Sequence, residues 1–286
     1  MNLRNAVCRI AGILCGIFLC TCAYQADPAL SGRIEAAYYN LRHDGVTSFR
    51  CKVLLVDSDR QRHLINAFLP FGDSIPEDIE YEAIVRSDGD VEAHIISTIE
   101  TRNRKLKSSL GDQASAAEKI LGSFLSIWKD FHFEPVSSDM DTVESIRSNA
   151  GGWTMKIVED ETRVELRISP DYRISELRDL ADEQNMVVQL TWRDSPKGYL
   201  LAGCRFHDTV SAFGGEYQIE YLEIGGHYLP KRLDFAKVYD DGRRDQGTFV
   251  FSHYAFSRME DAAVEQGDRS GLPTPAESFQ LHTVAP

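Results

Sequence analysis

Hydrophobic and polar residues alternate along most of the second half of the chain. From Trp153 onward, apolar side chains recur at every second position, a period typical of β-strands with one apolar and one polar face. Short connections such as Gly225-Gly226 and Asp241-Gly242 separate these runs and predict an antiparallel meander. The apolar positions of the predicted strands are Trp153, Met155 and Ile157; Val164, Leu166 and Ile168; Met186, Val188, Leu190 and Trp192; Leu200, Ala202, Cys204 and Phe206; Tyr217, Ile219 and Tyr221; Leu233 and Phe235; and Phe249 and Phe251.

Two segments of the first half have helical spacing instead. The first begins at Asp27-Pro28 and runs until Gly45, and the second covers residues 112–135. In both segments apolar residues recur every three or four positions, which predicts one apolar stripe on each helix. The stripes consist of Leu30, Ile34, Ala37, Tyr38 and Leu41 in the first helix, and of Ala117, Ile120, Leu121, Phe124, Trp128 and Phe131 in the second.

Between these two helices the period changes to two. Alternating residues from Phe49 to Leu55 predict a first strand. A hairpin is predicted over residues 81–95, with its tight turn at Asp88-Gly89. Residues 57–78 and 134–152 show no sustained period, and we expect them to be mainly loops.

The apolar faces of these strands determine the expected fold class. A large antiparallel sheet must cover its apolar face, and only two strong helices are available to do so. We therefore expect an α+β fold over residues 27–258, in which a curled antiparallel sheet, an unclosed half-barrel, is covered by two main helices. Its concave side is either a filled core or an open cavity that accepts a ligand, and the sequence favours neither. In the second case the ligand would contact Phe124, Trp128, Phe131, Trp153, Trp192, Phe206, Tyr221 and Phe235.

The two ends of the chain have the composition of segments outside the folded domain. Residues 1–26 combine Arg4, an uncharged apolar run and small residues, and we interpret them as a secretory signal peptide cleaved after Ala23 or Ala26. A lipid anchor at Cys22 is a less favoured alternative, because threonine precedes this cysteine. Residues 259–286 are polar and contain several prolines, so we expect a loosely ordered tail. The exported protein is expected in the periplasm or cell envelope.

Cysteine usage and charge restrict the partners of the exported chain. Cys51 and Cys204 lie on the apolar sides of predicted strands, and we expect them to be near each other. Export permits a disulfide between them, while two buried free thiols are the alternative. The chain of 286 residues has a formal net charge of −13, which disfavours nucleic acid as a partner and allows at most transient contact with an anionic membrane.

The sequence contains no recognised catalytic or metal-binding motif. Its eight histidines form no close ligand pair, and it has no nucleophile elbow, phosphate-binding loop or dinucleotide fingerprint. We therefore expect no enzymatic activity, no metal and no cofactor. One basic run, from Arg102 to Lys107, is interpreted as a solvated surface, with contact to acidic headgroups or an acidic partner as the alternative.

Three segments have a pattern that a known family shares. They read GVTSFRCKV from Gly45, EIGGHYLPKRLDF from Glu223 and GTFVFSHYAF from Gly247. With the opening helix, they resemble the bacterial periplasmic lipoprotein carriers of the LolA type, in the outer-membrane lipoprotein-sorting superfamily, over residues 28–97 and 153–256. The resemblance implies an unclosed barrel of antiparallel strands, covered by helices, that holds acyl chains. The family's Arg-Pro motif is absent, since Arg86 is followed by Ser87, so the resemblance implies the fold rather than lipoprotein transport itself.

These observations lead to two hypotheses for function. In the first, a non-enzymatic envelope protein binds a hydrophobic or lipidic ligand, such as a lipid, an acyl chain or a lipoprotein, in the apolar concavity. Exposing an acyl chain to water costs about 0.8 kcal/mol per methylene, so a cavity can stabilise it in transit. In the second, the concavity receives a partner polypeptide, as part of an interaction or sensory module. On the first hypothesis, Phe124 and Trp128 project from the second helix onto the sheet and touch the bound chain.

Overall fold

A computed structural model describes most of the region between the two ends. It covers residues 28–56, 79–89, 91–97, 104–133, 143–149, 151–159, 162–180, 186–258 and 280–281. The predicted signal peptide at 1–26, and the predicted tail apart from residues 280–281, lie outside the described residues.

Two helices and thirteen strands make up the described part of the chain. The helices are α2 (Pro28–Ala37) and α4 (Arg104–Phe133). The strands are β1 (Val46–Val56), β2 (Ile79–Arg86), β3 (Val91–Ile95), β4 (Val143–Asn149), β5 (Gly152–Glu159), β6 (Thr162–Ile168), β7 (Ile174–Asp179), β8 (Met186–Ser195), β9 (Gly198–Asp208), β10 (Gly214–Ile224), β11 (His227–Val238), β12 (Arg244–Arg258) and the two-residue β13 (Gln280–Leu281).

The strands form one antiparallel sheet that is not closed. Their order is β3-β2-β1-β12-β11-β10-β9-β8-β7-β6-β5-β4, with β13 paired to β12 off this path. Neighbours in the sheet are mostly neighbours in the sequence, as short connections require. The predicted α+β class, an unclosed antiparallel half-barrel with two helices, is confirmed.

The chain divides into two compact units. The first contains residues 1–40, 126–220 and 233–246, and the second contains residues 41–125, 221–232 and 247–286. Helix α4 and strands β10, β11 and β12 each contribute residues to both units.

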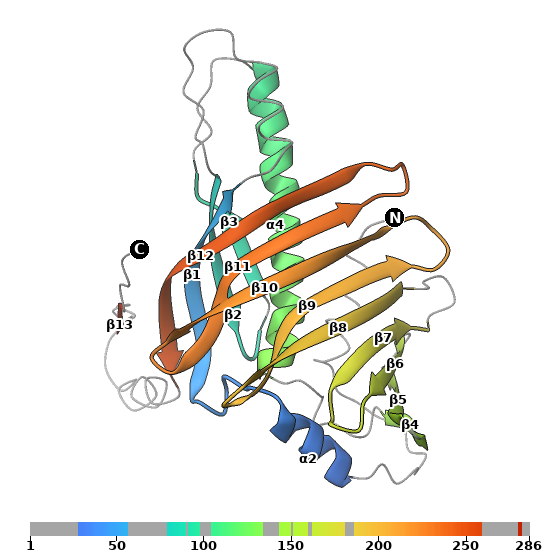
Figure 1. The fold of residues 1–286 in the computed structure, drawn as a ribbon. Helices are drawn as coiled ribbons and strands as arrows, with labels where there is room; N and C mark the ends of the chain where they lie inside the picture. The colour runs from blue at the N-terminus through green and yellow to red at the C-terminus, as the bar shows by residue number, and fades with distance from the viewer. Residues whose placement is uncertain are drawn as a thin grey trace, which may run out of the picture. The chain divides into compact units, whose positions relative to one another are not determined.

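The second unit is built around β1, which pairs with β2 on one side and β12 on the other (Figure 1). Its alternate residues Phe49, Cys51, Val53 and Leu55 are buried, which confirms the period of two in this segment. The part of α4 in this unit packs on the neighbouring strands. The Tyr81 hydroxyl on β2 donates a hydrogen bond to the Ala114 carbonyl oxygen at 3.1 Å, and Phe124 meets Phe251 of β12 with ring centroids 6.2 Å apart.

The first unit contains the meander from β4 to β9, helix α2, the last turns of α4 and parts of β10, β11 and β12. Helix α2 lies against β9 (Figure 1). Directly after the helix, Tyr38 forms a parallel bridge with Tyr199, and the Tyr39 N–H donates to the Tyr199 carbonyl oxygen at 3.1 Å. The chain therefore passes from the helix onto the edge of β9 without an intervening loop.

Four elements differ from the sequence-based prediction. Helix α2 ends at Ala37 rather than near Gly45, because the bridge to Tyr199 takes the backbone out of the helix. Helix α4 begins at Arg104 and ends at Phe133, whereas the prediction was 112–135, so Arg104, Lys105 and Lys107 of the basic run lie in its first turns. Strand β4 lies in the predicted loop 134–152. Strand β7 lies between the strands predicted around Leu166 and Val188, where no strand was predicted. Both strands have few apolar residues in alternation. Their β-conformation therefore depends on pairing with neighbouring strands rather than on their own sequence pattern.

Gly198 provides a test of the junction between α2 and β9. Its φ of +116° is unfavourable for other residues, and a Cβ there would lie 2.7 Å from the Tyr38 carbonyl carbon. We expect Gly198→Ala to lower the free energy of unfolding by more than about 1 kcal/mol. Gly111→Ala is the matched control, because nothing lies within 4 Å of its Cβ position in α4, and alanine should raise the free energy by about 0.5–1 kcal/mol. Urea denaturation of both variants measures this, and equal effects would contradict the close junction.

Candidate functional site

An aromatic cluster in the first unit contains two of the predicted ligand-contacting residues. Trp192 of β8 meets Phe131 of α4 with ring centroids 5.1 Å apart, and it meets Tyr38 at 4.7 Å. Tyr38 in turn meets Tyr199 at 5.8 Å. All three pairs have interplanar angles near 80°, the edge-to-face geometry that aromatic rings favour. We call these four residues, Phe131, Trp192, Tyr38 and Tyr199, the Trp192 cluster.

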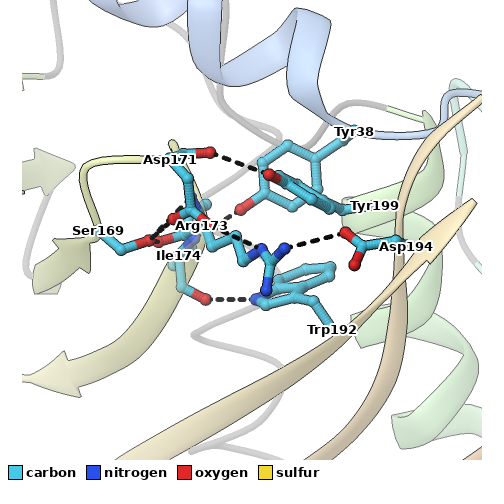
Figure 2. A network of polar contacts seen from close by, with 8 residues as sticks. All are labelled: Tyr38, Ser169, Asp171, Arg173, Ile174, Trp192, Asp194 and Tyr199. Carbon is cyan, nitrogen blue, oxygen red and sulfur yellow. Dashed lines mark hydrogen bonds and ion pairs between the residues drawn. The ribbon is translucent and has the colours of Figure 1, made fainter.

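The polar tips of two cluster residues hold the start of β7 in place. The Ile174 N–H donates to the Tyr38 hydroxyl oxygen at 2.6 Å, and the Trp192 Nε1–H donates to the Ile174 carbonyl oxygen, also at 2.6 Å (Figure 2). Both backbone groups of Ile174 are therefore satisfied by aromatic side chains. Burial raises the pKa of the Tyr38 hydroxyl well above its ordinary value, so it is un-ionised at neutral pH.

A charged group caps the cluster on its exposed side. The Arg173 guanidinium lies over the Tyr199 ring, 4.4 Å from its centroid. Its nitrogens lie 3.0 Å from an Asp171 carboxylate oxygen and 2.9 Å from an Asp194 oxygen (Figure 2). Hydrogen bonding to Tyr199 and the nearby carboxylates raise the pKa of Arg173. The turn is fixed further by Ser169, whose hydroxyl donates to the Arg173 carbonyl oxygen.

The burial of the four rings decreases from the helix toward this charged cap. Phe131 is 3% exposed and Tyr38 is also buried, whereas Trp192 and Tyr199 are partly exposed. The cluster thus connects the interior of the unit with its surface through rings that touch one another. Such a path is apolar along its length and polar at its outer end.

Trp128 and His132 also lie on α4, in the interior of the first unit. Both are fully buried, and their rings are in contact, tilted by 38° with centroids 4.5 Å apart. His132 Nδ1 lies 3.4 Å from the Tyr39 carbonyl oxygen, which fits a neutral ring that donates to it. Burial lowers the pKa of His132 from 6.5 to about 3, so the ring is neutral at physiological pH.

The other predicted ligand-contacting residues lie in several places. Phe124 and Tyr221 belong to the second unit, while Trp153, Phe206 and Phe235 belong to the first. Trp153 stacks on Tyr172 at 5.2 Å, and Phe206 meets Phe213 and Tyr217. The structure thus brings Phe131 and Trp192 into contact with each other, and it adds Tyr38, Tyr199 and Arg173, which the sequence did not indicate as site residues. For Tyr199, the only local signal in the sequence was its position next to Gly198 at the start of a strand.

Both cysteines of the folded region are free thiols in the structure. Cys51 lies on β1 in the second unit and Cys204 on β9 in the first, and both are buried. Burial raises the pKa of Cys51 well above its ordinary value and that of Cys204 to about 12. Their thiols are therefore protonated and unreactive at neutral pH.

The described residues contain no group of three histidine, cysteine, aspartate or glutamate side chains placed to hold a metal ion. Among the described helices, none is both long enough and apolar enough to span a membrane. Of the predicted basic run, Arg104, Lys105 and Lys107 are exposed on the first turns of α4, and Arg102 lies outside the described residues.

Comparison with known proteins gives one structural match. No protein-family model and no curated protein matches the chain. The chain is similar to a crystal structure from Vibrio parahaemolyticus that is described as an outer membrane lipoprotein-sorting protein domain, with 8% sequence identity and a TM-score of 0.27. The match covers 84% of this chain and 97% of that one.

His132 makes stability depend on pH in a defined direction. The native ring stays neutral down to about pH 3, whereas the unfolded chain binds a proton below about pH 6.5. Stability is therefore fully present above pH 6.5 and is lost as the pH falls toward 3. At pH 5 this contribution amounts to a loss of about 2 kcal/mol.

Urea unfolding at pH 7.5 and pH 5 measures this dependence. His132→Gln should reduce the difference between the two pH values, although it also destabilises the protein at both. His207→Gln, at an exposed position of β9, should leave the difference unchanged. An unaltered pH dependence in His132→Gln would show that the ring is already charged or solvated in the native state.

Alkylation identifies the state of the two cysteines. In denaturant without reductant, both the Cys51 and the Cys204 peptide should carry an iodoacetamide label when analysed by mass spectrometry. In the native protein both should react slowly, because the thiols are buried and protonated. Labelling of either peptide only after reduction would contradict the free-thiol state.

Proposed function

We propose that this chain is a non-enzymatic cell-envelope protein that binds a hydrophobic or lipidic ligand at the Trp192 cluster. The observation that carries the proposal is the gradient within the cluster, from the buried ring of Phe131 to the partly exposed rings of Trp192 and Tyr199. An acyl chain that follows these rings leaves water for an aromatic surface, and each buried methylene contributes about 0.8 kcal/mol.

The four rings of the cluster contact one another, so binding requires side chains to move. Trp192 and Tyr199 are the rings that can do so, because each is already partly exposed. Phe131 lies on α4 and is buried. The ligand therefore displaces the outer rings and rests against the inner one, while the helix keeps its place.

The hydrogen bonds at Ile174 limit this movement. Trp192 cannot turn far without leaving the Ile174 carbonyl oxygen without its partner, a cost of about 1–3 kcal/mol if the oxygen stays buried. A long apolar chain offsets this cost, and a short one does not. The site therefore favours long acyl chains over small apolar molecules.

The predicted export signal at residues 1–26 supports a location in the periplasm or cell envelope, where lipids must cross water between membranes. Lipid anchoring at Cys22 would keep the protein at a membrane surface and is the less favoured alternative. A carrier role for lipids or lipoproteins is compatible with either location.

Binding of a partner polypeptide is the second candidate, and the open sheet favours it. Strand β3 stands at one end of the strand order, and none of its five residues is buried. An extended peptide could add to such an edge through backbone hydrogen bonds. This candidate would make the protein an interaction or sensory module of the envelope.

Analysis of what co-purifies separates the two candidates. The protein is purified from its native envelope without detergent, extracted with organic solvent and examined by mass spectrometry. Lipid in near-stoichiometric amount supports the proposal. A bound peptide without lipid supports the second candidate and contradicts the first.

Two tryptophan variants locate the lipid site. Trp192→Leu should weaken the binding of a fluorescent long-chain fatty acid about tenfold, because it removes the central ring of the cluster. Trp153→Leu is the matched control, since Trp153 is also partly exposed but stacks on Tyr172 outside the cluster. It should leave binding unchanged per folded molecule, with the folded fraction measured by circular dichroism. Equal losses in both variants, or no saturable binding to the unaltered protein, would overturn the assignment of the site.

A further inference from the structure

Lys237 lies on the buried face of β11, next to apolar residues. Leu233 and Phe235 are buried on one face of the strand, and Lys237 follows them at the same period of two. Lys237 is itself only 8% exposed. A lysine this deeply buried is unusual unless it is paired.

Aromatic rings and a second cation surround this ammonium. Nζ of Lys237 lies 4.7 Å from the centroid of Tyr239 and 5.4 Å from that of Phe213. The Arg243 guanidinium lies over the same Tyr239 ring, 4.1 Å from its centroid. Two cations therefore share one aromatic ring at the end of β11, and the ring supplies only part of the attraction that a carboxylate would give.

The carboxylates near Lys237 are engaged elsewhere. Asp245 accepts a hydrogen bond from the Tyr239 hydroxyl at 2.7 Å, and Asp241 accepts one from the Arg243 backbone N–H at 2.9 Å. Asp240 is exposed in the adjoining turn. Across the described part of the chain, no hydrogen bond and no ion pair within 4.0 Å is found for Lys237 Nζ, although Asp245 acts on it at longer range.

A largely buried ammonium without an ion pair is costly, and either of two changes would reduce this cost. The amine can lose its proton, and burial does lower the pKa of Lys237 to about 8, with Asp245 raising it and Arg243 lowering it further. Alternatively, an anion can enter and pair with it. At neutral pH the amine is still mostly protonated, so an incoming anion would meet a charge that lacks a partner.

The surroundings of Lys237 indicate which kind of anion fits. Phe206 meets both Phe213 and buried Tyr217, which extends the apolar surface beside the ammonium. Gly215 allows the Phe206 ring to pack closely against the backbone of β10, because a Cβ at this position would lie 2.6 Å from the ring. A cation at the end of an apolar aromatic face matches a ligand that has an anionic end and an apolar body.

We propose that Lys237, assisted by Arg243, binds the carboxylate or phosphate group of an amphiphile whose apolar part lies along β9 and β10. This inference rests on the proposed function, and it names the ligand class as anionic amphiphiles. Tyr199 of the Trp192 cluster lies on the same strand as Phe206, which contacts Phe213 near Lys237, and the two residues are seven positions apart. At about 3.3 Å per residue the separation is about 23 Å, of the order of a long acyl chain.

Calorimetric titration with decanoate, decyl phosphate and decanol tests the proposal. These probes share one chain length and differ in the end group. The purified protein should bind the two anionic probes about tenfold more tightly than decanol at neutral pH. Lys237→Met should abolish this preference without weakening decanol binding, because methionine keeps the apolar bulk. Lys237→Arg should retain the preference, and Lys231→Met, at an exposed position of the same strand, is the matched control and should behave as the unaltered protein.

The outcomes distinguish this inference from the proposed function. Equal binding of all three probes, or a preference that survives in Lys237→Met, overturns the inference and leaves lipid binding intact. Absence of binding by any probe, together with absence of saturable binding of the fluorescent long-chain fatty acid, overturns both. Inorganic phosphate and acetate form a further arm: if either alone competes with decanoate, the site takes free anions as well as headgroups, and if neither does, the apolar body is required. Thermal melting of Lys237→Met, which should be no less stable than the unaltered protein, shows that the variant is folded.

Discussion

Each long strand of this protein has one apolar face, and the need to remove that face from water governs the rest of the structure. On β1 the four alternate side chains from Phe49 to Leu55 are buried almost completely. Burying apolar surface stabilises by about 25 cal/mol per Å², so a sheet of this size cannot leave such faces uncovered. The apolar stripe of α4 is long enough to serve both units: Phe124 packs in the second, and Trp128 and Phe131 pack in the first. Their three- and four-residue spacing keeps all three side chains on one side of the helix.

Covering an apolar face with aromatic residues creates a second requirement, because tyrosine and tryptophan bring polar atoms with them. In the Trp192 cluster these polar atoms are paired with the backbone of Ile174. The Ile174 N–H donates to the Tyr38 hydroxyl oxygen, and the Trp192 Nε1–H donates to the Ile174 carbonyl oxygen. The same two hydrogen bonds fix β7, a strand with little apolar character of its own. A cluster that holds a strand in place cannot open freely. The proposed ligand would therefore have to supply more apolar contact than the displaced rings lose, and the proposed binding would depend on its chain length.

The sequence predicted those parts of the fold that depend on local pattern. Strands β1, β5 and β6 alternate, β8 and β9 do so over most of their length, and the hairpin of β2 and β3 has its Asp-Gly turn, so each was located to within a few residues. The regular stripe of α4 located the helix, but its first two turns were missed. Strands β4 and β7 and the end of α2 depend on partners far away in the chain, such as Tyr199 for Tyr38, and no local period reports such a partner. For the same reason Phe131 and Trp192 were predicted as ligand contacts from their residue types, whereas the contact of Trp192 with Tyr38 and the position of Arg173 over Tyr199 were not predicted.

Arg173 and Lys237 show how two cations of the same unit can have opposite surroundings. Arg173 is partly exposed and lies between two carboxylates, so its charge is balanced within the protein. Lys237 is buried and has aromatic rings in place of an ion pair. The chain has 44 acidic residues against 31 basic ones, so a carboxylate for Lys237 was not scarce. A sequence selected only for stability would place a partner beside this ammonium or replace it with an apolar residue. Its retention on an apolar face is explained if the missing negative charge arrives with the ligand.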